Sequence, residues 1–255
     1  FFSACVVNLF AQNTWSDTIV LNSYTVLSNQ IQKNNYTTKS NNIAEVLQQN
    51  SSFYLKNYGS NLLSTLSVNG TSSTQSTVLW NGVNIYSPAL GLVDLSLLNV
   101  GSIDEFSLHT NSKNAVMGAE LSLQNHKENQ KNTVSLQTKY NSLMNFNLSF
   151  NAKINLSKRI ESHSTFFVGD YKNKYRVISD LHSIPYMPNA HGLQLSFMQN
   201  FFLTFNKNWE LNIHYWFNHF DRELPPTLSQ LESKQKQTDE SHRVISSLQK
   251  VFSKA

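Results

Sequence analysis

The stretch of sequence that decides the fold is residues 146–157, which read FNLSFNAKINLS. The even positions, from Phe146 to Leu156, carry apolar side chains, and the odd positions carry Asn, Ser or Lys. This strict alternation predicts one long β-strand with an apolar face and a polar face. Strands of soluble proteins average five or six residues, whereas a tilted strand that crosses an outer membrane needs about nine to eleven. The length of the segment therefore favours a membrane strand.

Other segments of the second half repeat this period. A second instance sets the apolar residues Leu193, Leu195, Phe197, Phe201, Leu203 and Phe205 against Gln194, Ser196, Asn200 and Thr204. A third, after a predicted turn at Lys207-Asn208, sets Trp209, Leu211, Ile213, Tyr215 and Phe217 against Glu210, Asn212, His214 and Asn218. A shorter pattern lies at residues 134–140. A membrane barrel has one strand face in lipid and the other towards a wet lumen, so these polar faces, which consist mostly of Asn, Ser, Gln and Thr, favour a barrel. The alternative that the pattern leaves open is an extracellular β-sandwich with unusually long strands.

The two halves of the chain differ in charge and in glycine content. Residues 1–125 hold 4 Lys+Arg and 6 Asp+Glu, whereas residues 126–255 hold 16 and 10, within a chain that is only 14% charged. Six of the 8 glycines lie between Gly59 and Gly118. The first half therefore has the turn chemistry of a compact α+β domain. The basic residues of the second half are scattered singly, which favours solvated strand ends and loops over a nucleic-acid surface.

A short helix and several tight turns are predicted in the first half. Asn42 and Glu45 have the spacing of a capping box, and apolar residues follow at helical intervals. From residue 53 to residue 123 the chain is a series of short apolar pieces, each closed by Gly or Asn. The pairs Asn69-Gly70 and Asn81-Gly82 supply the positive φ angles that tight turns require. These pairs are therefore predicted turns.

The first residues have the composition of an export signal. Residues 1–11 are almost entirely apolar and resemble the end of a secretory signal peptide with cleavage after Ala11. Cys5, the single cysteine, is interpreted as an ordinary residue of this apolar run rather than a lipid anchor. Cleavage would leave a mature chain without disulfides. We expect the chain to be a fragment of a longer exported protein.

The pieces of the first half, in their order and spacing, resemble the plug domain of TonB-dependent outer-membrane receptors. The resemblance covers residues 17–123, and the remainder resembles the first strands of the receptor barrel. Residues 77–85, TVLWNGVNI, stand where the family has "t-v-l-l-D-G-v-p-i". The other matching pieces are Ile43–Leu47, Tyr58-Gly59, Leu66–Gly70, Val93–Leu98, Ile103–Phe106 and Ala115–Ala119.

Some positions depart from the family pattern. Asn69 stands where the family has Arg, Asn81 stands where it has Asp, and the Gly-Gly that normally follows Gly118 is absent. The first two replacements remove charges expected to brace the plug against the barrel wall. Residues 222–226 and 237–239 resemble a barrel loop and a strand start in the cobalamin and siderophore branch of the family.

The resemblance implies an α+β plug domain followed by antiparallel transmembrane β-barrel strands of an incomplete barrel. It divides the chain into a signal-peptide remnant (1–11), a Ton-box region with a linker (12–40), a plug domain (41–125) and the N-terminal part of the barrel (126–255). The last segment has room for about six to eight strands, whereas a barrel that holds a plug needs on the order of 22. The barrel is therefore expected to be truncated.

The function that the resemblance implies is active uptake of a scarce solute of the iron-siderophore, haem or cobalamin class across the outer membrane of a Gram-negative bacterium. The implied partners are the TonB C-terminal domain with its inner-membrane energising complex, outer-membrane lipid, and a small-molecule or metal-chelate ligand. A Ton box would pair with TonB as an added strand. The candidate Ton box is Asp17, Thr18, Ile19, Val20 and Leu21, and the plug motif turns are Asn69, Gly70, Asn81, Gly82 and Gly118. The alternative for residues 17–21 is a first plug strand or a fraying terminus.

Catalysis finds little support in the sequence. The 8 histidines are dispersed, and His214 and His219 fall on opposite faces of a predicted strand. Asp104 and Glu105 are adjacent, so they point to opposite sides of an extended segment and make a poor acid/base pair. The sequence therefore predicts no enzyme, no cofactor, no metal site and no nucleic-acid partner. The runner-up function is a surface adhesin or carbohydrate-binding β-protein.

Overall fold

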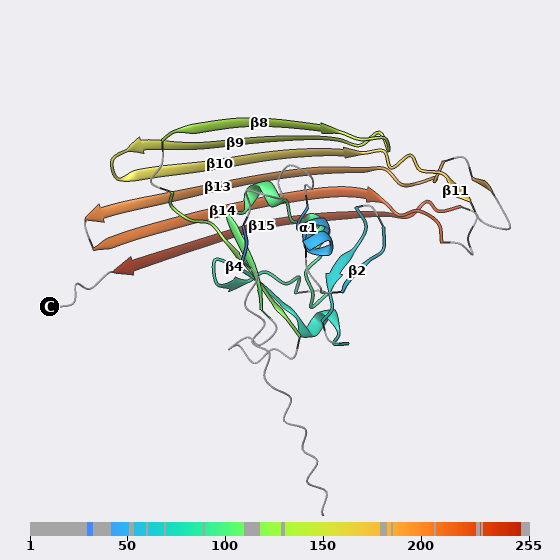
Figure 1. The fold of residues 1–255 in the computed structure, drawn as a ribbon, viewed down its shortest axis with the longest axis horizontal. Helices are drawn as coiled ribbons and strands as arrows, with labels where there is room; N and C mark the ends of the chain where they lie inside the picture. The colour runs from blue at the N-terminus through green and yellow to red at the C-terminus, as the bar shows by residue number, and fades with distance from the viewer. Residues whose placement is uncertain are drawn as a thin grey trace, which may run out of the picture.

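The computed structural model contains a long sheet and a smaller α+β unit that packs against one face of it (Figure 1). We call the smaller part, within residues 30–128, the plug-like unit. No helix among the described residues is long and apolar enough to cross a membrane. The structure describes residues 30–32, 42–50, 54–59, 61–68, 70–88, 90–109, 118–128, 131–178, 183–184, 186–206, 208–227, 230 and 232–250.

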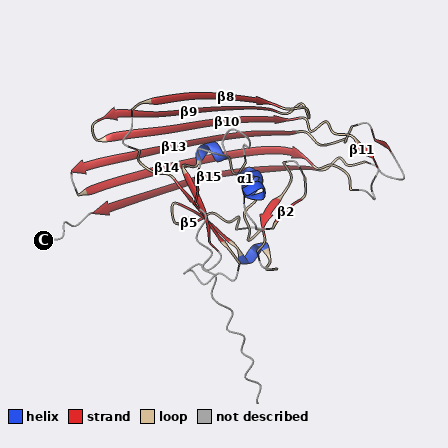
Figure 2. Ribbon diagram, in the orientation of Figure 1, coloured by secondary structure: helices blue, strands red, loops and turns tan. Residues whose placement is uncertain are grey.

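The long sheet has six antiparallel strands in the order β15-β14-β13-β10-β9-β8 (Figure 2). Neighbours in the sheet are neighbours in the sequence, which is the pattern of consecutive hairpins. The two small strands β11 and β12 pair within the connection between β10 and β13. The bounds are β8 Thr133–Tyr140, β9 Phe146–Ser157, β10 Ile160–Tyr171, β11 Val177–Ile178, β12 Ser183–Ile184, β13 Gly192–Asn206, β14 Trp209–Glu223 and β15 Lys236–Lys250.

The predicted polar face of the long strands is the face that meets the plug-like unit. Asn147 and Ser149 of β9 and Asn200 of β13 are all buried. On the other face, Leu156 is 60% exposed and Phe205 is 52% exposed. Apolar side chains that point outward over long strands are what a membrane-facing wall requires. The predicted fold class is therefore confirmed, and the strands of the structure form an open sheet rather than a closed barrel.

The plug-like unit contains a five-stranded sheet in the order β1-β6-β7-β4-β5. β4 and β7 pair in parallel, and the other neighbours are antiparallel. A separate hairpin, β2 with β3, and several single turns of 3-10 helix lie beside this sheet. The bounds are β1 Gln30–Gln32, α1 Ile43–Asn50, β2 Leu55–Asn57, β3 Ser64–Leu66, η2 Ser73–Gln75, β4 Thr77–Trp80, β5 Val83–Asn84, η3 Leu95–Leu97, η4 Val100–Ser102, β6 Glu105–His109 and β7 Glu120–Gln124.

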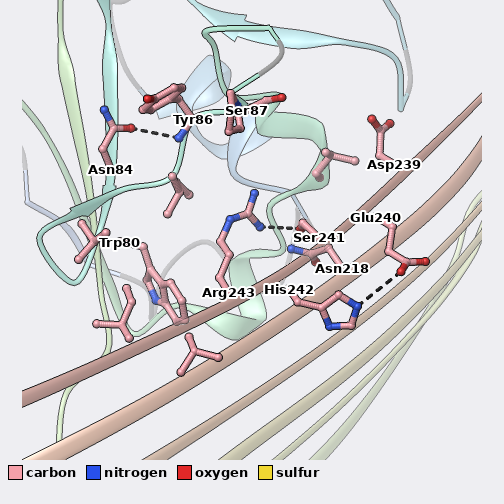
Figure 3. A pocket seen from close by; sticks show the side chains of 16 residues that line it. Trp80, Asn84, Tyr86, Ser87, Asn218, Asp239, Glu240, Ser241, His242 and Arg243 are labelled. Carbon is pink, nitrogen blue, oxygen red and sulfur yellow. Dashed lines mark hydrogen bonds and ion pairs between the residues drawn. The ribbon is translucent and has the colours of Figure 1, made fainter.

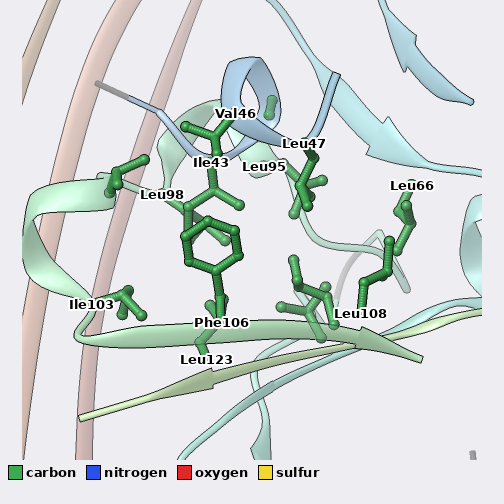
Figure 4. Close-up of a cluster of buried hydrophobic side chains, with 14 of the residues drawn as sticks. Ile43, Val46, Leu47, Leu66, Leu95, Leu98, Ile103, Phe106, Leu108 and Leu123 are labelled. Carbon is green, nitrogen blue, oxygen red and sulfur yellow. The ribbon is translucent and has the colours of Figure 1, made fainter. Parts of the chain in front are cut away.

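The core of the plug-like unit forms where α1 covers the small sheet (Figure 4). Asn42 caps α1, because its Oδ1 accepts a hydrogen bond from the Glu45 amide at 2.8 Å, which is the N-cap half of the predicted capping box. Ile43 and Leu47 are then fully buried against residues of η3 and β6. Each such apolar side chain contributes about 1.5–3 kcal/mol when it is fully buried. The same cluster includes Met198 of β13 and Trp216 of β14, so the core of the plug-like unit is continuous with the long sheet.

Candidate functional site at the plug and sheet interface

Arg222 of β14 joins the long sheet to the plug-like unit through several polar contacts. Its side chain is only 2% exposed, and its Nη2 lies 2.7 Å from Asp94 Oδ2 and 3.0 Å from Asp239 Oδ2 of β15. Its Nη1 donates to Ser96 Oγ and to the Asn61 carbonyl oxygen, both at 3.2 Å. One guanidinium thus joins two wall strands to two loops of the plug-like unit.

Asp94 connects this ion pair to the local structure of the plug-like unit. Its Oδ1 accepts hydrogen bonds from the Ser96 amide, which caps η3, and from the Ser64 amide at the start of β3, both at 3.0 Å. Its Oδ2 accepts a hydrogen bond from Nη2 of Arg222. The carboxylate therefore holds η3, the β2–β3 hairpin and β14 together.

Lys153 of β9 makes a second ionic contact. Its Nζ lies 3.0 Å from Asp104 Oδ1 and also forms an ion pair with Glu128. The other oxygen of Asp104 accepts hydrogen bonds from Asn125 Nδ2 at 3.3 Å and from the His126 amide at 3.2 Å. The segment that leaves the plug-like unit for the wall is therefore tied to β9 where it departs.

An aromatic contact lies between these two ionic contacts. Trp80 of β4 and Trp216 of β14 are both fully buried, and their ring centroids are 5.1 Å apart in an edge-to-face arrangement. The ring of His214 lies 6.0 Å from Trp80. The Trp80 Nε1 donates to Asn125 Oδ1 at 2.9 Å, so the indole is both packed and hydrogen-bonded.

The close approach of the two parts also needs a small residue. A Cβ on Gly101 of η4 would lie 2.8 Å from Asn99 Oδ1 and 3.2 Å from Ser149 Oγ of β9. Nearby, Gln194 Nε2 of β13 donates to the Leu97 carbonyl oxygen at 3.1 Å. The polar inner face of the wall thus bonds directly to the backbone of the plug-like unit.

The plug motif turns that the sequence singled out occupy strained or crowded backbone positions. Asn81 and Gly82 have φ values of 46° and 83° and form the two-residue turn between β4 and β5, in which Trp80 pairs with Val83. Gly70 has a φ of 76°. A Cβ on Gly118 would lie 2.8 Å from the Gln75 carbonyl oxygen and 2.5 Å from Ser76 Oγ. Asn69 and the candidate Ton box, residues 17–21, lie outside the described residues.

Sequence reasoning missed the residues that anchor the interface. The basic residues of the second half were expected at strand ends and loops, and this expectation is wrong for Lys153, which lies within β9 and faces the plug-like unit. A lysine in the polar face of a long strand was the only available signal, because its acidic partners are distant in the sequence. No group of three or more His, Cys, Asp or Glu side chains that could hold a metal ion occurs in the described part of the chain.

Exposed aromatic side chains lie at the end of the long sheet where β10 and β14 finish, next to the connections that span 172–191 and 224–235. Tyr54 and Tyr58 on the β2–β3 hairpin are 71% and 55% exposed, and Tyr186 in the connection from β10 to β13 is 63% exposed. A hydrogen bond with Tyr58 raises the pKa of the Lys56 ammonium, which also lies over the Tyr58 ring. Stacking and hydrogen-bonding groups are thus presented at this end.

Comparison with known proteins agrees with this architecture. Residues 20–121 match the family model described as the TonB-dependent Receptor Plug Domain. No curated protein matches the sequence.

Three solved structures illustrate the likeness of fold. The ferripyoverdine receptor of the outer membrane of Pseudomonas aeruginosa, bound to ferripyoverdine, matches with a TM-score of 0.64 and 12% identity over 82% of this chain. The FrpB iron transporter from Neisseria meningitidis matches with a TM-score of 0.56 and 9% identity, and the copper transporter OprC with 0.56 and 13%, each over 71% of this chain. The chain spans 29% of the length of each of these three proteins. Residues 20–121 are therefore similar to a TonB-dependent receptor plug domain, and the chain has the fold of such a plug packed on antiparallel strands like those of a receptor barrel.

Proposed function

We propose that this chain is part of a TonB-dependent outer-membrane transporter that takes up a scarce solute of the iron-siderophore, haem or cobalamin class. The observation that carries the proposal is the plug packed on the polar inner face of long strands and fixed there by the buried Arg222–Asp94 ion pair. A domain in this position obstructs passage along the wall, so solute can pass only when the plug moves. Solved structures with the same fold include an iron transporter, a copper transporter and a ferripyoverdine receptor.

In this proposal the solute approaches from the end of the sheet with the longer loops. Membrane barrels have short turns on the periplasmic side and longer loops outside. Only two residues separate β9 from β10 (158–159) and β13 from β14 (207–208), whereas the connections at the opposite ends of β10 and β14 span 172–191 and 224–235. The β2–β3 hairpin, with its exposed tyrosines, then faces the outside. Aromatic faces and hydroxyl groups suit metal chelates with planar or conjugated ligands.

The coupling between solute and plug would run through Asp94. This carboxylate accepts from the Ser64 amide of the hairpin and pairs with Arg222 of the wall. A solute that displaces the hairpin would therefore strain the ion pair that holds the plug to β14. Weakening of this contact would prepare the plug for the pull exerted by TonB.

The candidate Ton box at residues 17–21 would be the segment that TonB binds and pulls. A free extended segment can join an exposed sheet edge of a partner as an added strand, through main-chain hydrogen bonds. In this proposal, residues 12–40 are the Ton-box region and linker, residues 41–125 are the plug, and residues 126–255 are barrel strands. The TonB C-terminal domain is the proposed partner on the periplasmic side.

The test of the transport proposal is the substitution Val20→Pro in cells that make the whole receptor. Proline removes a main-chain donor and resists strand pairing, so energised uptake should fall to background while surface binding remains. The probes are a panel of ferric siderophores, haemin and cyanocobalamin in radiolabelled form, measured with and without a protonophore. Val20→Thr, which keeps the donor and the strand propensity, is the matched control. Normal energised uptake by the Val20→Pro receptor would contradict the assignment.

Cell fractionation distinguishes the proposal from the alternative of a surface adhesin or carbohydrate-binding protein. A transporter of this fold should fractionate with the outer membrane and show heat-modifiable mobility in gels, because a barrel resists detergent until it is boiled. A soluble binder would show neither property. Recovery in the soluble fraction would sink the transport proposal.

A further inference from the structure

Three basic side chains are exposed together in the connection that follows β10, just before β11 (Figure 1). Buried and exposed positions alternate there, because Tyr171 and Asn173 are buried whereas Lys172, Lys174 and Arg176 are exposed. The three cations therefore share the side of the chain opposite to the buried residues. We call these three residues the basic stripe.

The backbone that carries the basic stripe is fixed by neighbouring loops. The amide of Asn173 donates to Asn145 Oδ1, and Asn173 Nδ2 donates to the Ala190 carbonyl oxygen, both at 2.8 Å. The Lys174 amide donates to the Leu143 carbonyl oxygen at 3.0 Å. The stripe is thus presented from a hydrogen-bonded framework that includes the β8–β9 turn.

The cations of the basic stripe form no ion pair with the residues that the structure describes. The other charged groups at this end of the wall do have partners. These contacts are Asp170 with His191 at 2.8 Å, Glu223 with Lys236 at 3.5 Å, His219 with Asp221 at 3.1 Å and with Glu240 at 3.2 Å, and Glu240 with His242 at 3.5 Å, the last drawn in Figure 3. The connection 172–191 holds three basic residues against one acidic residue, Asp180, which lies outside the described residues. The stripe is therefore an unneutralised positive surface.

The basic stripe begins where the apolar outer face of the wall ends. Phe146 of β9 and Leu193 of β13 both lie opposite Asp170 of β10, and both are exposed. Lys172 follows two residues later, and Met144 in the adjacent β8–β9 turn is 43% exposed. Cations directly beyond a lipid-facing apolar surface lie at the depth of the lipid headgroups.

An aromatic ring lies beside the stripe. The Lys174 Nζ is 5.8 Å from the ring centroid of Tyr186, which is itself exposed. Tyrosine rings are common at the boundary between hydrocarbon and water, since one end of the ring is apolar and the other is polar. The combination of cations, tyrosine and exposed apolar side chains is typical of a surface that meets lipid headgroups.

We propose that the basic stripe binds the phosphate groups of phosphorylated lipids in the outer leaflet. The Arg176 guanidinium can hold a phosphate at two points, and the two lysines supply compact positive charges beside it. Acyl chains of the same lipid would lie along the exposed side chains of Phe146 and Met144. The inference rests on the proposed function only for the orientation of the wall, and it concerns a lipid partner rather than the solute.

Titration of the whole receptor in an uncharged detergent with fluorescent diphosphoryl lipid A, followed by anisotropy, tests the inference. Replacing all three residues of the basic stripe with Gln should weaken binding at least tenfold, because each cation near an anionic lipid surface adds to the attraction. The matched control is Lys131→Gln, Lys158→Gln and Arg159→Gln together, which removes the same charge from exposed positions towards the opposite end of the wall. Equal affinities of the two triple variants would overturn the proposal.

Two further probes identify the group that the stripe recognises. Dephosphorylated lipid A should bind at least tenfold more weakly than the diphosphoryl form, and high salt should weaken binding of the diphosphoryl form. Heparin, an anionic polymer without acyl chains, should displace lipid A only at much higher concentrations. Equal binding of the two lipid forms, or displacement by heparin at concentrations similar to those of lipid A, would contradict recognition of a phosphorylated lipid.

The outcome of this titration is separate from that of the transport test. Binding in detergent requires neither TonB nor an energised membrane. A receptor that loses energised uptake with Val20→Pro but binds lipid A equally well without its basic stripe would retain the transport proposal and lose the lipid site. Stripe-dependent lipid binding in a receptor whose uptake does not depend on Val20 would have the opposite meaning.

Discussion

At the scale of single residues, the interface depends on a few buried polar groups. Arg222 and Asp94 have side chains only 2% and 6% exposed. A buried ion pair adds little net stability compared with apolar packing, but removal of one partner leaves an uncompensated buried charge. Such a contact therefore fixes the position of the plug more strongly than it stabilises the fold.

Arg222→Ala should destabilise the docked plug by about 3–5 kcal/mol, because Asp94 then remains buried without its cation. Thermal unfolding and protease cleavage of the plug would measure the loss. Lys236→Ala, on the same hairpin, removes a 3.5 Å ion pair to Glu223 in which the lysine is 72% exposed, and should cost about 0–1 kcal/mol. Equal effects of the two substitutions would show that the buried pair does not anchor the plug.

Gly118→Ala should destabilise the plug by about 1–3 kcal/mol, because the new methyl group would meet the Gln75 carbonyl oxygen at 2.8 Å. Backbone atoms at this distance cannot move aside as a flexible side chain can. Denaturant unfolding of the variant would give the change. Ser122→Ala on the adjacent β7 is the control and should change stability by less than about 1 kcal/mol. A Gly118→Ala variant as stable as this control would contradict the close approach.

At the scale of elements, the hairpin of β4 and β5 fits against β14 through one aromatic pair. The Asn81-Gly82 turn sets the register in which Trp80 pairs with Val83, and alternation then directs Trp80 towards the wall. The ring centroid of Trp216 on β14 lies 5.1 Å from that of Trp80. The geometry of a two-residue turn thus determines where the plug contacts the wall.

Trp216→Ala should destabilise the protein by about 3–5 kcal/mol, because a large side chain with no exposed surface leaves a cavity between plug and wall. Trp209→Ala, at the start of the same strand and only partly buried, should cost clearly less. Chemical denaturation monitored by circular dichroism measures both. Equal losses would mean that Trp216 does not pack against the plug in solution.

The strands also differ in how clearly the sequence predicts them. β9, β13 and β14 were predicted from alternation, and β4 from its apolar run before Asn81-Gly82. β10 was missed, and of β15 only the start at residues 237–239 was indicated, by the family resemblance rather than by alternation. β10 has Ser162 and Ser164 on its outward face with Phe167 inside, and β15 has polar residues on both faces, so neither shows an apolar period. Their partners in the sheet, rather than their own pattern, make them strands.

At the scale of the whole molecule, the ionic contacts of Arg222 and of Lys153 bind parts of the plug that lie far from each other. In the strand register, Lys153 of β9 lies opposite His163 of β10, which lies opposite Asn200 of β13. Asn200 in turn lies opposite His214 of β14. Arg222 is therefore eight residues along β14 from the level of Lys153. At about 3.3 Å per residue the two anchors are more than 20 Å apart. They should therefore act independently.

The destabilisations by Arg222→Ala and Lys153→Ala should add in the double variant to within about 0.5 kcal/mol. Thermal unfolding of the four members of this double-mutant cycle would measure the coupling. Asp94→Ala combined with Arg222→Ala provides the contrast, because residues in direct contact should show strong non-additivity. Coupling above about 1 kcal/mol between Arg222 and Lys153 would mean that the plug is released as a unit.

The sequence by itself determined the fold class, the long strands with their polar inner face and the turns of the plug, because periodicity and turn chemistry are local properties. Only the tertiary structure decided which residues join plug and wall. Asp94 meets Arg222, Asp104 meets Lys153 and Trp80 meets Trp216 across long stretches of chain. Contacts of this kind follow from how two surfaces fit together, and no local pattern encodes that fit.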